Sequence, residues 1–193
     1  MLTLTGRSTQ KKITESQRTL YFREDQDILN LIAYVLKGNA VVIPLMTGKS
    51  GFVTLTDNVR SIFDEILFIQ RFYRKTGGIR MRHQIITMDF QQDLTKGQEM
   101  EQVRSIAALM SQFYLYKGFQ NVWSVFFKGD DIAISFAINT VCCFDGSKYH
   151  YNKKDVLDEE NTYLSAIHSM VVKQNGSWGY IDYTPLEFYP YSV

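Results

Sequence analysis

The stretch Asp130-Asp-Ile-Ala-Ile-Ser-Phe-Ala-Ile-Asn-Thr-Val141 decides the fold of this chain. Large apolar side chains stand at positions 132, 134, 136 and 138, and small or polar ones stand between them. Because consecutive side chains of a β-strand point to opposite faces of the sheet, this alternation predicts a strand with one face buried under helices. Asp145 and Gly146 then predict a hairpin-type turn that leads into Lys148-Tyr-His150.

Length and composition are those of one globular domain. The chain has 193 residues, of which 45% are hydrophobic and 21% charged, and its formal net charge is +1. Such a chain is long enough to bury a core, so we expect a single domain over residues 24–193. Residues 1–23 are polar and predict a poorly specified N-terminal arm. No apolar run approaches the ~20 residues of a membrane span, and the N-terminus is too polar for a signal peptide, so we expect a cytoplasmic protein without membrane contact.

The rest of the chain alternates between helical and strand patterns. Apolar residues at helical spacing predict helices ending at Lys37-Gly38-Asn39, starting at a cap on Thr56 or Asp57, and starting at the Thr95/Gln98 capping box. A fourth helix is expected over residues 154–173, and strands over residues 40–45, 83–90 and 121–127. Hairpin-connected strands with intervening helices predict an α+β fold, an antiparallel sheet with helices on one face.

The strand at 130–141 resembles the metal-binding strand of the relaxase/mobilisation nucleases, which nick plasmid DNA for conjugation. That family has a D-H-x-H-x-H-x-x-x-N pattern, and the resemblance implies that its three histidines hold a divalent ion. Here Asp131, Ala133 and Ser135 occupy the histidine positions, and Phe126 or Phe127 lies near a further, upstream histidine of the family. The strand is retained in this chain, but its metal ligands are replaced.

Other segments resemble the same family in the same order, from about Asp27 to Met170. Leu31-Ile-Ala-Tyr-Val35 is similar to the family's D-Y-I helix, which places its DNA-cleaving nucleophile on Tyr34. Three further segments resemble its T-R-x-x-Y-x-K-T-G-G, H-Y-V-Q-S-F and G-K-K-Y-H-x-x-K-K-D motifs: Phe68-Ile-Gln-Arg-Phe-Tyr-Arg-Lys-Thr-Gly-Gly78, His83-Gln-Ile-Ile-Thr-Met-Asp-Phe90, and Gly146-Ser-Lys-Tyr-His150 with Lys153-Lys-Asp155. The resemblance implies a relaxase-like, palm-type single domain, with Ala133 and Ser135 facing a cleft near Tyr34.

The family's chemistry is a transesterification, in which a tyrosine attacks a phosphodiester of single-stranded DNA and the bound ion stabilises the charge on the phosphate. Without the ion, a phenol with a pKa near ~10 is a poor nucleophile at pH 7. We therefore expect a relaxase-like protein of a mobile genetic element that is catalytically inactive, uses no cofactor or metal, and has a DNA-binding or accessory role in mobilisation or conjugative transfer.

Two alternatives remain open at this point. In the first alternative, the chain is an active nickase that uses Tyr34 and a Mg²⁺ or Mn²⁺ ion held by Asp130 and Asp131, helped by His83. Otherwise it is a protein-interaction scaffold without DNA affinity, which the near-neutral charge favours, since phosphate binding usually requires a basic excess. Each residue also has an ordinary interpretation: Tyr34 as a packing residue, His83 as a structural strand residue, and the two aspartates as a solvated turn.

Possible partners follow from the resemblance: single-stranded or origin DNA, an active relaxase, or transfer proteins. The expected DNA-binding residues are Arg80, Arg82, His83, Lys148, His150, Lys153 and Lys154. Thr47-Gly-Lys-Ser50 ends like a phosphate-binding loop, but Ile43 stands where that motif requires glycine, so an ordinary loop is expected there.

Overall fold

The structure, a computed structural model, describes residues 22–40, 42–89, 95–128, 131–150, 154–174 and 182–183. Most of the predicted N-terminal arm therefore lies outside the described residues. The helices are α1 (Asp25–Lys37), α2 (Val59–Phe72), α3 (Lys96–Tyr116) and α4 (Lys154–Gln174). The strands are β1 (Met46–Ser50), β2 (Met81–Asp89), β3 (Asn121–Lys128), β4 (Asp131–Asn139) and β5 (Asp182–Tyr183). None of these helices is long and apolar enough to cross a membrane.

The strands form one antiparallel sheet in the order β1-β3-β4-β2-β5. The predicted strand, β4, occupies the centre and pairs with β3 on one side and β2 on the other. The α+β class and the central position of this strand are therefore confirmed.

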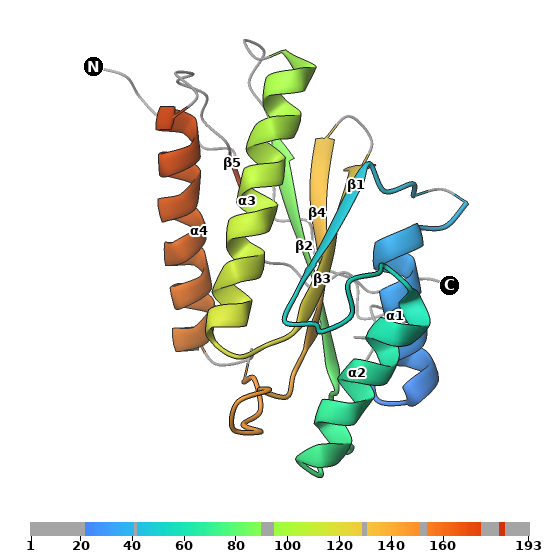
Figure 1. The fold of residues 1–193 in the computed structure, drawn as a ribbon. Coiled ribbons are helices and arrows are strands. Elements are labelled where there is room, and N and C mark those ends of the chain that lie inside the picture. Colours follow the sequence, from blue (N-terminus) through green and yellow to red (C-terminus); the bar gives the residue numbers. More distant parts are fainter. Residues whose placement is uncertain are drawn as a thin grey trace, which may run out of the picture.

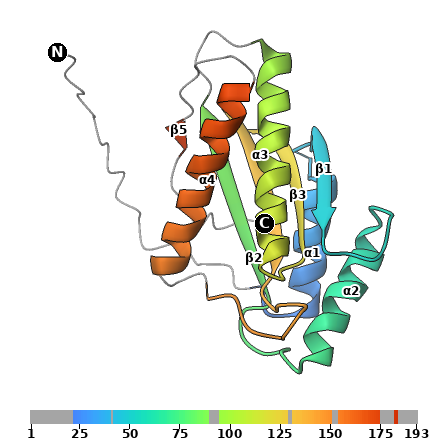
Figure 2. The same cartoon turned by 60° about the vertical axis from the view of Figure 1, so that its left-hand side comes forward.

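Helices cover both faces of the sheet (Figures 1 and 2). Helices α3 and α4 lie on one face, and α1 with α2 lies on the other. The prediction of helices on a single face is therefore wrong. The cause lies in β4, whose odd-numbered residues are small enough for α1 to pack against them, so a second helical layer takes the place of solvent.

The α3/α4 face holds the larger hydrophobic core. As predicted, Ile132, Ile134, Phe136 and Ile138 all point into it. The expected stripe of α3 packs onto them, with Met100 only partly buried and the other members buried: Val103, Ile106, Ala107, Met110 and Tyr114. Burial of this many large side chains on one face is the main hydrophobic contribution to the fold.

The helix ends show which capping residues the sequence pattern identified. Thr95 caps α3 and forms the expected reciprocal capping box with Gln98. Helix α2 is capped by Asn58, whose side chain accepts hydrogen bonds from the backbone N–H groups of residues 60 and 61, so the expected cap at Thr56 or Asp57 is wrong. Asparagine competes with threonine and aspartate for this position, and three neighbouring candidates made the sequence ambiguous by one or two residues.

The strand expected over residues 40–45 lies one segment later, in β1. Pro44 has no backbone N–H to give to a sheet, whereas residues 46–50, among them the polar Thr47, Lys49 and Ser50, pair with β3. Gly48 lies against the indole of Trp123, and a Cβ at this position would come within 2.4 Å of the ring. Thr47-Gly-Lys-Ser50 is thus strand and not a loop, because it pairs with β3. Close packing against Trp123 explains why position 48 is glycine.

The predicted turn at Asp145 and Gly146 is present. Gly146 has a φ of 72° and its backbone N–H donates to the carbonyl of Cys142. A side chain at Gly146 would also collide with the ring of Tyr73. The turn leads into a single bridge between Val141 and Lys148, which fixes the start of the segment that carries His150.

Candidate functional site

The α1-facing side of β4 is closed. Ala133 and Ser135 are both fully buried, and Ala133 packs with Ile85 and Phe126 beneath the partly buried Val42. The positions that correspond to metal ligands in the relaxase-type pattern are therefore filled by packed side chains. The expectation that Ala133 and Ser135 face a cleft is corrected in this respect, because apolar neighbours surround Ala133 and the His83 ring lies against Ser135.

Three side chains from α1, β2 and β4 meet on this face. The His83 Nε2 atom lies 2.7 Å from the Ser135 hydroxyl oxygen. The ring of Tyr34 packs edge-on against the His83 ring, with 6.0 Å between centroids. The structure thus brings together Tyr34, His83 and Ser135, three positions singled out in the sequence.

The electrostatic state of this cluster follows from burial. Desolvation lowers the pKa of His83 to about 3, so the imidazole is neutral at pH 7. Its hydrogen bond with Ser135 is therefore one between two uncharged groups. Desolvation also raises the pKa of Tyr34, which lies half-buried in the core cluster under α1. The His83 ring is thus buried and hydrogen-bonded within the fold, an environment that favours its ordinary interpretation as a structural strand residue over the expected DNA-binding role.

Arg80 and Arg82 also require correction, because both guanidinium groups are internal. Arg80 is 5% exposed and pairs with Asp25 at 2.6 Å, while its Nε donates to the side chain of Gln70 at 2.8 Å. Arg82 is 3% exposed and donates through both terminal nitrogens to Glu160, at 2.6 and 3.0 Å. These arginines hold elements together and are not presented to a phosphate backbone.

The Arg82–Glu160 pair ties α4 to β2 within a polar network. The hydroxyl of Tyr149 donates to the same Glu160 carboxylate, and the Arg82 guanidinium lies over the Tyr149 ring at 5.4 Å. Burial raises the pKa of Glu160, and the neighbouring Arg82 opposes that shift. The network explains why two charges are tolerated here: each has several partners.

The remaining expected DNA-binding residues occupy the segment after the Gly146 turn. Lys148 is half-buried, and its ammonium group donates to the carbonyl of Ile79 at 3.1 Å. Burial lowers its pKa, with further contributions from Arg80 and Lys75. His150 is exposed. Lys153 and the side chain of Lys154 lie outside the described residues.

The altered-metal alternative depends on the carboxylates of Asp130 and Asp131. Asp130 and the side chain of Asp131 lie outside the described residues. Within the described part of the chain, no group of three or more His, Cys, Asp or Glu side chains is arranged to hold a metal ion.

Asn139, which ends the relaxase-type strand pattern, belongs to a buried amide network that the sequence did not reveal. Its Oδ1 accepts from Gln70, and its Nδ2 donates to Gln120, both at 3.0 Å. Gln120 in turn donates to the carbonyl of Gly51. The only signal in the sequence was Gln70, a polar residue at a position of α2 that belongs to its buried side. This network fixes the end of the sheet and the loop after β1.

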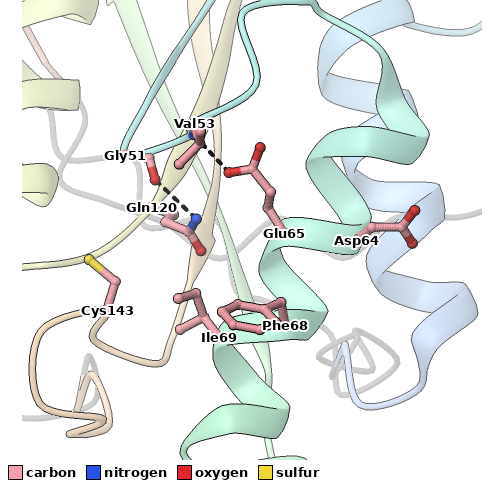
Figure 3. Close-up of a pocket in the computed structure, with 8 residues that line it drawn as sticks. All are labelled: Gly51, Val53, Asp64, Glu65, Phe68, Ile69, Gln120 and Cys143. Atoms are coloured by element: carbon pink, nitrogen blue, oxygen red, sulfur yellow. Dashed lines mark hydrogen bonds between the residues drawn. The ribbon is translucent and has the colours of Figure 1, made fainter.

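A second feature missed from the sequence is an open hollow of about 500 Å³ beside α2 (Figure 3). Phe68 and Ile69 of α2 line one side, and Gly51, Gln120 and Cys143 line the other. Glu65 turns toward the loop after β1 and accepts from the backbone N–H groups of Val53 and Thr54, at 2.8 and 2.7 Å. The available signal was the spacing of Phe68 and Phe72, which fall off the buried stripe of this helix.

Comparison with known proteins adds little to this geometry. No family model matches the chain, and no curated protein sequence matches it. Among solved structures, the chain is similar to one from work titled "Molecular Basis of Vancomycin Resistance Transfer in Staphylococcus aureus". The TM-score is 0.46 with 10% sequence identity, and the match covers 70% of this chain and 73% of that chain. A likeness this weak carries no argument about family or activity.

Proposed function

We propose that this chain is a catalytically inactive, relaxase-like domain of a mobile genetic element with an accessory role in DNA mobilisation. The observation that carries the proposal is the closed sheet face beside Tyr34. Ala133 and Ser135 have no exposed surface, and Ser135 is hydrogen-bonded to a neutral His83. This supports a strand retained for its fold while the space for an ion and its imidazole ligands has been filled.

The state of Tyr34 is consistent with this proposal. Nucleophilic attack needs a phenolate or a base that takes the phenol proton, and a raised pKa disfavours the phenolate. His83 lies next to Tyr34, but its Nε2 is engaged by Ser135. Tyr34 is therefore better suited to packing α1 onto the sheet than to attacking a phosphodiester.

A second candidate, the protein-interaction scaffold, is favoured by the internal arginines. Arg80 and Arg82 are neutralised by Asp25 and Glu160, so they add little to a basic surface. An accessory role through protein contact requires no such surface, whereas an accessory role on DNA requires other cations. The residues Lys153 and Lys154 are the expected source in that case.

A cleavage assay tests the inactive state. The chain is incubated with a single-stranded oligonucleotide from its element's transfer origin and Mg²⁺ or Mn²⁺, and covalent protein–DNA adduct is measured on a denaturing gel. We expect no adduct. An adduct that forms with the native chain and disappears in Tyr34→Phe, which removes only the hydroxyl, would refute the proposal and revive the nickase.

A binding assay separates the accessory role on DNA from the scaffold. Fluorescence anisotropy of a labelled single strand is followed while salt is raised from low concentration. If DNA is bound, affinity should fall steeply with salt and weaken further in the double variant Lys153→Glu/Lys154→Glu, because counterion release drives binding. No affinity even at low salt would leave the scaffold as the function.

A further inference from the structure

We infer that the outer face of α2 and the loops beside it form the contact surface of a symmetric dimer, whose partner is a second copy of this chain. The surface depends on neither Tyr34 nor DNA and so goes beyond the proposed function. It is defined by five exposed apolar residues: Val53, Leu55, Phe68, Phe72 and Phe144.

The exposure of these residues is high for side chains of their kind. Phe68, Phe72 and Phe144 are 64, 67 and 68% exposed, and Val53 and Leu55 are 89 and 95% exposed. The rings of Phe68 and Phe72 stack on each other with centroids 6.1 Å apart. A gathered apolar patch of this kind on a folded domain marks an interaction site more often than scattered single residues do.

Val53, Phe68, Phe72 and Phe144 are linked through one hollow and the end of α2, and Leu55 lies in the same loop as Val53. Val53 and Phe68 line the same hollow, together with Cys143, which precedes Phe144 (Figure 3). The Tyr73 hydroxyl donates to the carbonyl of Phe144 at 2.9 Å, and the Tyr73 ring packs against Phe72, so α2 is fixed to the turn that carries Phe144. The surface therefore presents projecting rings next to a hollow, on rigidly connected elements.

The area of the surface fits a dimer. A phenylalanine side chain contributes on the order of 200 Å² when buried, so the five residues offer roughly 600 Å² per copy at their present exposure. Two such surfaces would bury roughly 1,200 Å², which is the lower end of the range for stable protein–protein interfaces.

The charges along α2 are complementary to those of a second copy of the helix, which favours the second copy as the partner. Two antiparallel α2 helices related by a two-fold axis at Phe68 place each residue before position 68 opposite the residue equally far after it. Asp64, four residues before, then faces Phe72 and its neighbour Arg71 on the other copy. Asp64 and Arg71 are 56 and 62% exposed, and their present partners, Arg60 and Asp25, are also exposed at the surface. Surface ion pairs of this kind are weak, so they can re-form across the interface.

The first experiment measures the mass of the full 193-residue chain by sedimentation at increasing concentration. We expect a dimer, and Phe68→Asp should raise its dissociation constant at least tenfold, because a carboxylate would be buried at the axis. Ile43→Asp is the matched control: Ile43 is 72% exposed but precedes β1, at the other end of that strand from the Val53 loop, so dimerisation should be unchanged. A native chain that stays monomeric at about 100 μM, or a dimer that survives Phe68→Asp, would overturn the inference.

The second experiment tests the two-fold axis. In a Cys143→Ser background, Phe68→Cys places a thiol next to its own symmetry mate and should form an inter-chain disulfide under mild oxidation, whereas Ile43→Cys should not. Asp64→Arg and Arg71→Asp should each weaken the dimer severalfold, and the double variant should restore it. Equal cross-linking at both cysteines, or no rescue in the double variant, would contradict the antiparallel α2 contact. Both experiments are independent of the cleavage assay, so the dimer and the proposed function can fail separately.

Discussion

The two faces of β4 are both buried, but by different means. On the α3/α4 face, Ile134 and Phe136 pack into a core of large side chains, and Arg82 and Glu160 form an ion pair at its edge. On the α1 face, Ala133 and Ser135 are small, and a neutral histidine supplies the polar contact. One face thus combines a large apolar core with a buried ion pair, and the other is a compact face of small, fully buried residues. The difference shows that side-chain size, as well as polarity, decides what a strand face contacts.

The largest effect is expected at the buried ion pair between Arg82 and Glu160. Glu160→Gln leaves Arg82 buried without a counter-charge, so the free energy of unfolding should fall by about 3–5 kcal/mol. Urea denaturation of the native chain and the variant measures the change. Glu159→Gln is the control, because the Glu159 pair with Lys117 is partly exposed and should contribute less than about 1 kcal/mol. Equal effects at the two positions would show that the buried Arg82–Glu160 pair contributes no more to stability than the partly exposed Lys117–Glu159 pair.

A pH titration probes the α1 face. The pKa of His83 is about 3 in the folded protein and near its ordinary value of 6.5 in the unfolded chain. As the pH falls, the unfolded chain therefore binds a proton on His83 at a higher pH than the folded protein does. The contribution of a neutral His83 to stability is complete above pH 6.5 and is lost progressively as the pH falls from 6.5 toward 3. We expect a loss of about 1.4 kcal/mol per pH unit in this window, or roughly 2 kcal/mol by pH 5.

His83→Gln separates this histidine from the carboxyl groups, which titrate in both proteins. The difference in unfolding free energy between the two chains should change with pH over this window, and the native chain should lose more. Parallel pH profiles would mean that His83 protonates without disturbing the fold, contrary to the closed face described above.

The smallest of the three effects is expected at Ser135. Ser135→Ala removes the partner of a buried ring nitrogen, so the unfolding free energy should fall by about 1–2 kcal/mol. A double-mutant cycle with His83→Phe isolates the coupling between the two side chains, which should be near ~1 kcal/mol. A coupling of zero would indicate that the hydrogen bond contributes nothing and that the face is held by packing alone.

Local pattern was sufficient for most of the elements. The alternation in residues 130–141, the Thr95 capping box and the turn at Gly146 all depend on near neighbours in the chain, and each is present in the structure. Strand β1 was missed because it is held by pairing with β3 and by the packing of Trp123 on Gly48, both more than 70 residues later in the chain. Contacts at that separation leave no periodic signal in the sequence.

For the candidate site, the sequence by itself identified Tyr34, His83 and Ser135 and the absence of histidines on the strand. Only the tertiary structure decided what surrounds them. It decided whether the small residues of β4 border solvent or a helix, and whether an arginine side chain extends to the surface or pairs with a carboxylate. Arg80 and Arg82 illustrate the physical reason. A basic residue looks the same in the sequence whether or not a carboxylate pairs with it in the fold, and the partners of these two, Asp25 and Glu160, lie 55 and 78 residues away. The charge of a side chain follows from the sequence, but its burial depends on how the helices and strands pack.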